Sequence, residues 1–246
     1  MSGAVVLLLG VIGLLVGSAV WAIAASQAAQ RPLLSGPACA SCSTPLPVVA
    51  WLPLHGFGRA RRCRTCGVEQ PIARVLFELG VAGYFAFVAA RSEGGVSLAA
   101  TLVFTVPLLV ILLVDWWTRY IHTNIIGLGL LLGFGFALVD GVGTLLNHLL
   151  ATGVALLAFG FFFALAAGIY RNIAVVPFGR GDVYLAAVIG AMTGWPDVAT
   201  ALFYGMIFGG GGAVLLLVTR RAGRRDAVAY GPYLCIGALV VLLIRV

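Results

Sequence analysis

The stretch PFGRGDVYLAAVIGAMTGW, residues 177–195, places an aspartate at the start of a long apolar run. Asp182 follows a Gly-Arg-Gly tripeptide, and the residues after it read as a membrane helix. A carboxylate in or near hydrocarbon is costly, and such residues are usually functional. We therefore expect Asp182 to have a specific role, which the rest of the chain helps to define.

The composition predicts an all-α polytopic membrane protein. Of the 246 residues, 62% are hydrophobic and 9% are charged, and the mean hydropathy is +1.11. These values exclude an ordinary soluble domain. The first apolar run lacks a basic segment before it, so we expect a retained helix and not a cleaved signal peptide. Windows of about 20 residues predict eight transmembrane spans, near residues 4–25, 75–90, 98–116, 124–139, 145–169, 181–195, 198–218 and 230–245.

The arginines predict the orientation of these spans. The chain has fifteen basic residues, all of them arginine. If the N-terminus is outside, only Arg91 and Arg245 fall outside and thirteen arginines are cytosolic. Positive charge collects on the cytosolic side of membrane proteins. The net charge of +7 is therefore explained by membrane topology and does not indicate binding to nucleic acid. We expect a protein of the cell (inner) membrane with both termini outside. The expected cytosolic loops are 26–74, 117–123, 170–180 and 219–229.

Four cysteines predict a metal site in the first cytosolic loop. CASC contains Cys39 and Cys42, and CRTC contains Cys63 and Cys66. Two CxxC pairs at this separation suit a tetrahedral Zn²⁺ site, and four thiolates leave no open position, so the zinc would be structural. The alternative is two disulfides, which are rare in the reducing cytosol. We divide the chain into a first helix, a small zinc-binding insert and a seven-helix membrane core, over residues 1–25, 26–74 and 75–246.

Two aspartates are candidates for acid–base chemistry. Asp115 ends the apolar run VFTVPLLVILLVD, and the topology puts it and Asp182 at the cytosolic ends of two spans. Two carboxylates brought close share a proton, so one can activate water while the other donates a proton. Gly179 and Gly181 would allow close approach of a substrate and unusual backbone angles. Glu78, inside the second span, is a third buried acid that could support the site.

Other roles for these acids remain open at this point. Asp182 could cap the N-terminus of a helix, or pair with Arg119 or Arg180. Membrane acids also form ion and proton paths. A proton-coupled transporter is therefore the alternative to a peptidase, although it does not explain the double CxxC.

Several segments together resemble a known family. The sequence resembles the bacterial prepilin peptidases, the type IV leader peptidase family of GxGD intramembrane aspartyl proteases. The resemblance covers nearly the whole chain in order. Its segments are GLLVGSAV (13–20), the double CxxC, PIARVLFELGVAGYF, DWWTRYIHTNI, GRGDVYLAAVIGAMTGW and AYGPYLCIGALV.

The resemblance implies a function. Members of this family cleave a short leader from prepilins and pseudopilins at the cytosolic face, and bacterial members usually methylate the new N-terminus with S-adenosylmethionine. By motif position, Asp115 and Asp182 would be the catalytic pair and the four cysteines would bind zinc. The chain departs from the family pattern at Tyr184, commonly Lys, and at His122. The segment WAIAASQAAQRP also lacks the usual Asn and Arg-Leu-Pro, so S-adenosylmethionine is expected only if methyl transfer is retained.

Overall fold

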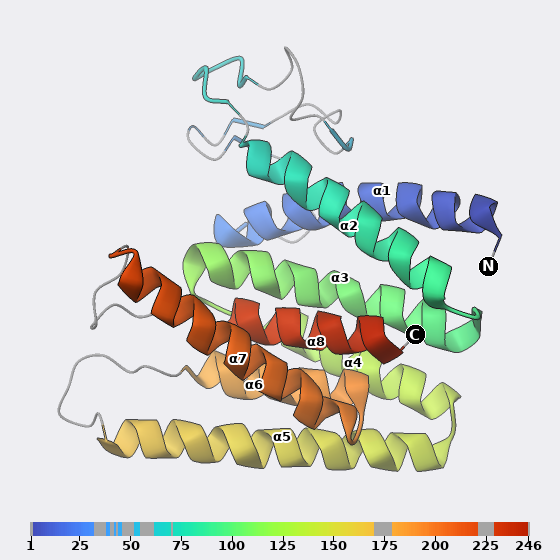
Figure 1. The fold of residues 1–246 in the computed structure, drawn as a ribbon. Coiled ribbons are helices and arrows are strands. Elements are labelled where there is room, and N and C mark those ends of the chain that lie inside the picture. The colour runs from blue at the N-terminus through green and yellow to red at the C-terminus, as the bar shows by residue number, and fades with distance from the viewer. Residues whose placement is uncertain are drawn as a thin grey trace. The chain divides into compact units, whose positions relative to one another are not determined.

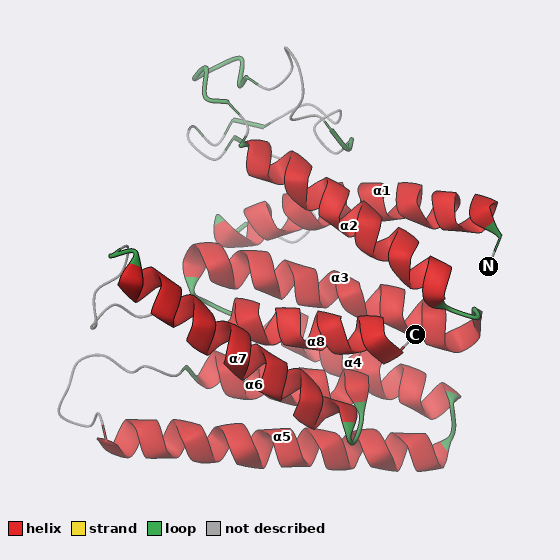
Figure 2. Cartoon of the chain, in the orientation of Figure 1, coloured by secondary structure: helices red, strands yellow, loops and turns green. Residues whose placement is uncertain are grey.

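The computed structural model of this protein describes residues 2–31, 38–39, 42, 44–45, 52–54, 62–69, 71–169, 179–220 and 229–245. Within these residues every regular element is a helix, which confirms the predicted all-α class (Figures 1 and 2). The helices are α1 (Gly3–Ala28), α2 (Ile72–Arg91), α3 (Gly95–Thr118), α4 (Thr123–Val139), α5 (Val142–Ile169), α6 (Arg180–Thr193), α7 (Asp197–Val218) and α8 (Gly231–Arg245).

Five of these helices are long and apolar enough to cross a membrane, namely α1, α2, α3, α5 and α7. Helices α4 and α8 are also apolar but shorter, and α6 has only 14 residues. A polytopic membrane protein is therefore supported. Each of the eight predicted spans corresponds to one helix, but membrane crossing by all eight stays a prediction.

The chain forms two compact units, Met1–Leu102 and Val103–Arg245. The first holds α1, α2 and the described part of the cysteine insert. The second holds the end of α3 and all of α4 to α8. These two units do not test the division into three parts that the sequence predicts, so that division stays a prediction.

In the first unit, glycines let α1 and α2 approach closely. A Cβ atom added at Gly13 would lie 2.8 Å from Cβ of Phe85, and one at Gly17 would lie 3.1 Å from Cα of Glu78. Small residues at helix contacts are typical of membrane bundles. The close packing brings Ser18 of α1 beside the first turns of α2, where the charged residues of that helix lie.

In the second unit, α6 is the central helix. All its residues from Leu185 to Thr193 are buried. A Cβ atom added at Gly129 of α4 would lie 2.6 Å from Val188, and one at Gly190 would lie 2.8 Å from the carbonyl oxygen of Ala151 in α5. Helix α6 also contacts α7 and α8 (Figure 1). It is therefore surrounded by protein.

Polar contacts from α5 hold the far end of α6. The Trp195 backbone N–H donates to Oδ1 of Asn147 at 2.7 Å, and Nδ2 of Asn147 donates to the Trp195 carbonyl at 3.1 Å. Nδ1 of the buried His148 lies 2.7 Å from the carbonyl oxygen of Ala191. These contacts fix the register of α6, and with it the position of Asp182 at the near end.

Candidate active site

Asp182 lies in the first turn of α6 and is buried, with 8% of its surface exposed. The backbone N–H of Gly179 donates to its Oδ2 at 3.0 Å, and the Asp182 N–H lies 3.2 Å from the carbonyl oxygen of Gly179. The carboxylate thus caps its own helix, one of the roles considered from the sequence. A helix N-terminus also stabilises negative charge. The cap fixes the orientation of the carboxyl group.

Asp115 lies near the end of α3 and is 5% exposed. Its Oδ2 is buried and has no hydrogen-bond partner among the described residues. A Cβ atom added at Gly231 would lie 2.6 Å from this oxygen. The first residue of α8 therefore packs directly against the carboxyl group of Asp115, and a side chain at position 231 would displace it.

The structure brings the two aspartates to one place. They are close enough to interact electrostatically, and Cys235 of α8 lies within range of both. Ile121, between α3 and α4, fills the space beside them. Its Cδ1 would lie 3.2 Å from a Cβ at Gly181 and 3.4 Å from one at Gly231. The end of α3 and the first turns of α6 and α8 therefore converge around the acid pair.

The structure gives a different reason for the glycines than the sequence did. Gly179 has φ −93° and ψ 154°, which is extended backbone open to any residue, so the expectation of unusual backbone angles is wrong there. Gly181 lies inside α6 and packs on Ile121. Close packing explains Gly181, whereas the hydrogen bond from Gly179 to Asp182 uses a backbone N–H that any residue except proline could supply.

Neither aspartate forms an ion pair with Arg119 or Arg180 in the part of the chain that the structure describes. Arg119, at φ +57°, still interacts electrostatically with Asp115 over a longer range. The pairing considered from the sequence is therefore not supported. Two buried carboxyl groups without a close counter-charge are an arrangement in which one proton is shared.

Glu78 belongs to the first unit, where it is fully buried in a polar network. Arg74 donates from Nε to its Oε1 at 2.8 Å and from Nη2 to Oγ of Ser18 at 2.9 Å. The backbone N–H of Leu54, in the cysteine insert, donates to Oε2 of Glu78 at 2.6 Å. Glu78 thus connects α1, α2 and the insert, whereas both aspartates lie in the second unit.

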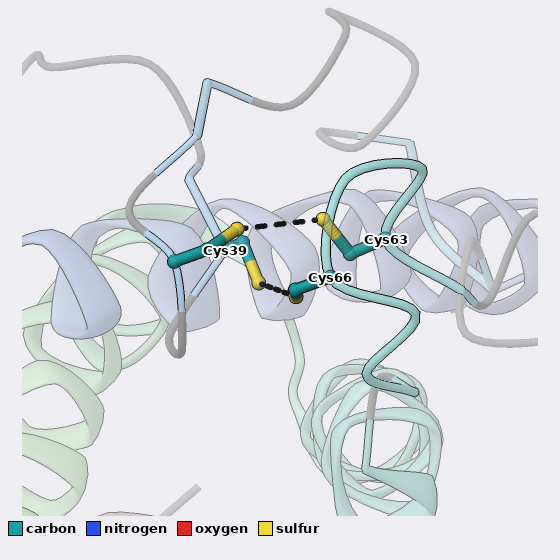
Figure 3. A group of neighbouring side chains, drawn as sticks. Cys39, Cys63 and Cys66 are labelled. Carbon is teal, nitrogen blue, oxygen red and sulfur yellow. Dashed lines mark hydrogen bonds between the residues drawn. The ribbon is translucent and has the colours of Figure 1, made fainter.

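The four cysteines form a candidate metal centre. Their Sγ atoms all lie within 4.8 Å of one another. Those of Cys39 and Cys66 are 3.5 Å apart, and those of Cys42 and Cys63 are 3.7 Å apart; Figure 3 shows the thiols pointing toward each other. Tetrahedral zinc with bonds of about 2.3 Å needs sulfurs about 3.8 Å apart. A disulfide needs about 2.05 Å, so the disulfide alternative is wrong for these thiols. The donor set and spacing fit Zn²⁺.

The two cysteine loops are built alike. The Cys39 N–H donates to the carbonyl of Thr44 at 3.0 Å, and the Cys63 N–H donates to that of Val68 at 2.9 Å. Each loop is closed by an isolated β-bridge at equivalent positions. The bridges join Ala38 to Pro45 and Arg62 to Glu69. The sequence shows no tandem repeat beyond the cysteines themselves, because the side chains around them differ while the backbone pattern is the same.

Hydrogen bonds in the loops favour the thiolate form that metals bind at Cys42 and Cys63, whereas the neighbouring Cys39 thiol raises the pKa of the Cys66 thiol to about 12. The Thr44 hydroxyl, 3.1 Å from Sγ of Cys42, lowers the pKa of the Cys42 thiol to about 6, with help from the Thr44 backbone. Backbone hydrogen bonds from Cys66 and Thr65 lower the pKa of the Cys63 thiol. These groups would stabilise the bound thiolates.

Two residues at the site were not singled out from the sequence. Gly231 belongs to AYGPYLCIGALV, one of the segments that carry the family resemblance, so that segment could have identified it. Ile121 carries no such signal, because an isoleucine beside an apolar helix is unremarkable. Only the structure shows that it packs on both Gly181 and Gly231.

Comparison with known proteins agrees with the family suggested by the sequence. Curated relatives named prepilin leader peptidase/N-methyltransferase include those of Pseudomonas putida, 28% identical and covering 80% of this chain, and Myxococcus xanthus, 29% identical and covering 87%. The Bacillus subtilis protein of that name is 26% identical over 86% of the chain. The chain spans only 66% and 64% of the length of the first two relatives, and 82% of the third. No solved structure matches it significantly.

Two family profiles match adjoining parts of the chain. The bacterial peptidase A24 N-terminal domain matches residues 11–92, which include the cysteine insert. The type IV leader peptidase family matches residues 102–214, which include both candidate catalytic aspartates. Together the two profiles cover most of the chain, and the chain belongs to the type IV leader peptidase family.

Proposed function

We propose that this chain is a membrane aspartic endopeptidase that removes the leader peptide of prepilin-like proteins at the cytosolic face. Asp115 and Asp182 are its catalytic pair. The observation that carries the proposal is the convergence of these two buried carboxyl groups where α3, α6 and α8 meet, without a close arginine among the described residues. The names of the curated relatives support the substrate class.

The pair divides the work of peptide hydrolysis. One carboxylate takes a proton from water, which attacks the scissile carbonyl, while the other carboxyl group gives its proton to the carbonyl oxygen. The first group then passes the proton it took from water to the leaving amine as the C–N bond breaks. Asp182 is held by the Gly179 N–H. Oδ2 of Asp115 has no partner among the described residues, so it has the capacity to hold the shared proton or the attacking water.

The substrate class follows from the place of the site. A prepilin-like protein has a basic leader followed by an apolar helix. That helix packs laterally in the bilayer, which brings its cytosolic end, where the scissile bond lies, level with Asp115 and Asp182. Gly179 and Gly181 lie at the start of α6 beside Asp182, whereas Glu78 lies in the first unit and binds the Leu54 N–H of the insert.

Zinc has a structural role in this proposal. The zinc would be held by Cys39, Cys42, Cys63 and Cys66. Four thiolates leave no open position for water, so the metal would cross-link the insert and would not activate water. The relatives' names also include N-methyltransferase. Among the described residues, no contact identifies a binding site for S-adenosylmethionine, and the proposed hydrolysis does not use it. The transporter alternative draws no support from the family profiles or the relatives.

The test is the mass of a mature pilin. A pilin precursor from the same organism is co-expressed with the wild-type chain, and the mass of its N-terminus distinguishes uncut, cut, and cut-plus-methyl products. Asp115→Asn and Asp182→Asn should each lower cleavage by at least about a thousandfold, because a shared-proton pair needs two carboxyl groups. The matched control is Asp140→Asn, an exposed aspartate after α4 that should leave cleavage unchanged.

Each result has a clear reading. An uncut precursor with the wild-type chain, at normal membrane levels, rejects the peptidase. Near-normal cleavage by either catalytic variant rejects the assignment of the pair but keeps the activity. Cleavage without added methyl shows a peptidase that does not methylate.

A further inference from the structure

The Glu78 carboxylate of α2 uses both of its oxygens. Oε1 accepts from Nε of Arg74 at 2.8 Å, one turn earlier in the same helix, and Oε2 accepts from the backbone N–H of Leu54 at 2.6 Å. Glu78 and Arg74 are 0% and 3% exposed. Hydrogen bonds to a charged group are among the stronger polar contacts in proteins. One oxygen therefore faces the buried arginine, and the other binds the cysteine insert.

The backbone of Leu54 is held in an unfavourable conformation. Its φ is +60°, in the left-handed region, which costs a residue with a Cβ atom roughly 1–2 kcal/mol. Such conformations persist where the surrounding contacts hold them. The hydrogen bond to Glu78 is a contact of this kind, and it is made by the backbone, while the leucine side chain is 39% exposed. The backbone N–H is therefore the group that docks on α2.

The docking point lies between the two cysteine pairs along the chain. Twenty residues separate Cys42 from Cys63, and eleven of them precede Leu54. The second pair, Cys63 and Cys66, lies on a stretch of chain whose two ends, Leu54 and Glu78, are joined by the hydrogen bond. Closing a loop costs conformational entropy. Docking and zinc binding close loops that share these residues, so each lowers the entropic cost of the other.

We infer that Glu78 is a positioning residue of the cysteine metal centre: it docks the Leu54 N–H on α2 and thereby favours the arrangement of the four thiols that binds zinc. The inference rests on the zinc site of the proposed function and is independent of the peptidase. It gives a role to a buried acid that the proposed hydrolysis does not use. Coupling between two binding events is reciprocal, so zinc also strengthens the docking of the insert on α2.

The experiment measures the zinc dissociation constant of the full-length protein in detergent, by competition with a chromophoric chelator. In Glu78→Gln a single carbonyl oxygen remains for two donors, so either Arg74 or Leu54 faces an amide NH₂ group. Leu54→Pro removes the N–H from the other side and leaves the buried ion pair in place. Each variant should weaken zinc binding by at least about fivefold, the lower end of typical coupling between two sites.

Two controls separate docking from other effects. Leu54→Gly removes the side chain but keeps the N–H and suits the left-handed backbone, so zinc binding should stay within about twofold of the wild type or become tighter. Glu69→Gln makes the same acid-to-amide change in the exposed Arg62–Glu69 pair, in the loop of the second cysteine pair, and should also stay within about twofold.

A double variant shows whether the two changes act on one contact. Glu78→Gln/Leu54→Pro should bind zinc within about twofold of the weaker single variant, because both substitutions remove the same hydrogen bond. Losses that multiply in the double variant overturn the inference, since the two residues would then act separately.

The other outcomes are also decisive. Wild-type zinc affinity in Glu78→Gln or in Leu54→Pro overturns the inference. An equal loss in Leu54→Gly and Leu54→Pro does so too, because it assigns the effect to the leucine side chain. If Glu78→Gln does not fold, this comparison at Leu54 decides alone, since neither substitution touches the buried ion pair. A wild-type chain that binds no zinc rejects the proposed metal site and the inference with it, and leaves the proposed peptidase standing.

Discussion

At the scale of residues, the site depends on close contacts at two glycines. Gly231 and Gly181 both lie where a Cβ would press on a neighbour, on Asp115 in one case and on Ile121 in the other. The sequence identified Asp115 and Asp182 as candidates because a charged residue beside an apolar run is conspicuous. It could not show which glycine touches which acid, because that contact depends on how α3, α6 and α8 cross.

Gly231→Ala tests the closest of these contacts. The added Cβ would lie 2.6 Å from Oδ2 of Asp115, so the carboxyl group or α8 must move. A displacement of about 1 Å at a catalytic group can cost about a hundredfold in rate, so we expect at least a tenfold loss of cleavage at normal membrane levels. The matched control is Gly210→Ala in α7, where a Cβ meets nothing within 4 Å. Equal cleavage by the two variants would show that Asp115 tolerates the shift.

At the scale of elements, a buried ion pair helps to join the cysteine insert to the first two helices. Arg74 and Glu78 are 3% and 0% exposed, and the Leu54 N–H completes the coordination of the Glu78 carboxylate. The sequence marked Glu78 as a buried acid but gave no partner for it. Arg74 was used only in the arginine count that predicted the membrane orientation, and Leu54 binds through its backbone. The contacts of Glu78 with these two residues could therefore not be predicted from residue types.

Glu78→Gln should destabilise the protein strongly. It removes the charge that Glu78 sets against the buried Arg74, and breaking such a pair costs about 3–5 kcal/mol. Thermal unfolding of the purified protein in detergent measures the loss as a lower Tm. The control is Glu69→Gln, which breaks the exposed Arg62–Glu69 pair, with side chains 72% and 42% exposed, and should cost at most about 1 kcal/mol. If the Tm of Glu78→Gln is no lower than that of the control, the Arg74–Glu78 pair does not stabilise the protein.

Cys63→Ser should separate the insert from the peptidase. Loss of one of four thiolates weakens zinc sharply and unfolds the segment that the metal holds together. The aspartates lie in the second unit, which has its own packing, so the variant should keep some cleavage while it loses zinc and any methyl transfer of the wild type. Elemental analysis gives the zinc content, and pilin mass from the same cells gives both activities. A full zinc equivalent in the variant would exclude the four-cysteine site, and loss of all cleavage would show that the insert supports the peptidase.

At the scale of the whole molecule, the sequence predicted the number and order of the helices well. Each predicted apolar run corresponds to one of the eight described helices, because a membrane-spanning segment must satisfy its own backbone hydrogen bonds. The ends were less accurate: α5 begins at Val142 and not near residue 145, and no role for Asn147 and His148 within it was predicted from the sequence. Those side chains bind the end of α6, and such a tertiary role leaves no mark in hydropathy.

The orientation of the helices yields a labelling prediction. The arginine distribution puts the loop at 219–229 in the cytosol and Asp140 outside; residues 221–228 lie outside the described part of the chain. A membrane-impermeant thiol reagent added to intact cells should label Asp140→Cys rapidly and Gly223→Cys only after permeabilisation. The wild-type chain gives the background of the native cysteines. Rapid labelling of position 223 in intact cells would reverse the topology.

The shortness of the central helix has a consequence for the surrounding lipid. With 14 residues, α6 is about 21 Å long, against about 30 Å for the hydrocarbon layer of a typical bilayer. Helix α8, with 15 residues, is hardly longer. If both helices cross the bilayer as the sequence predicts, we expect the acid pair at their starts to lie beneath the level of the headgroups, or the bilayer to thin to meet it. Water must travel further to the scissile bond as acyl chains lengthen, so the rate of cleavage should depend on the hydrophobic thickness of the membrane in which the enzyme is reconstituted.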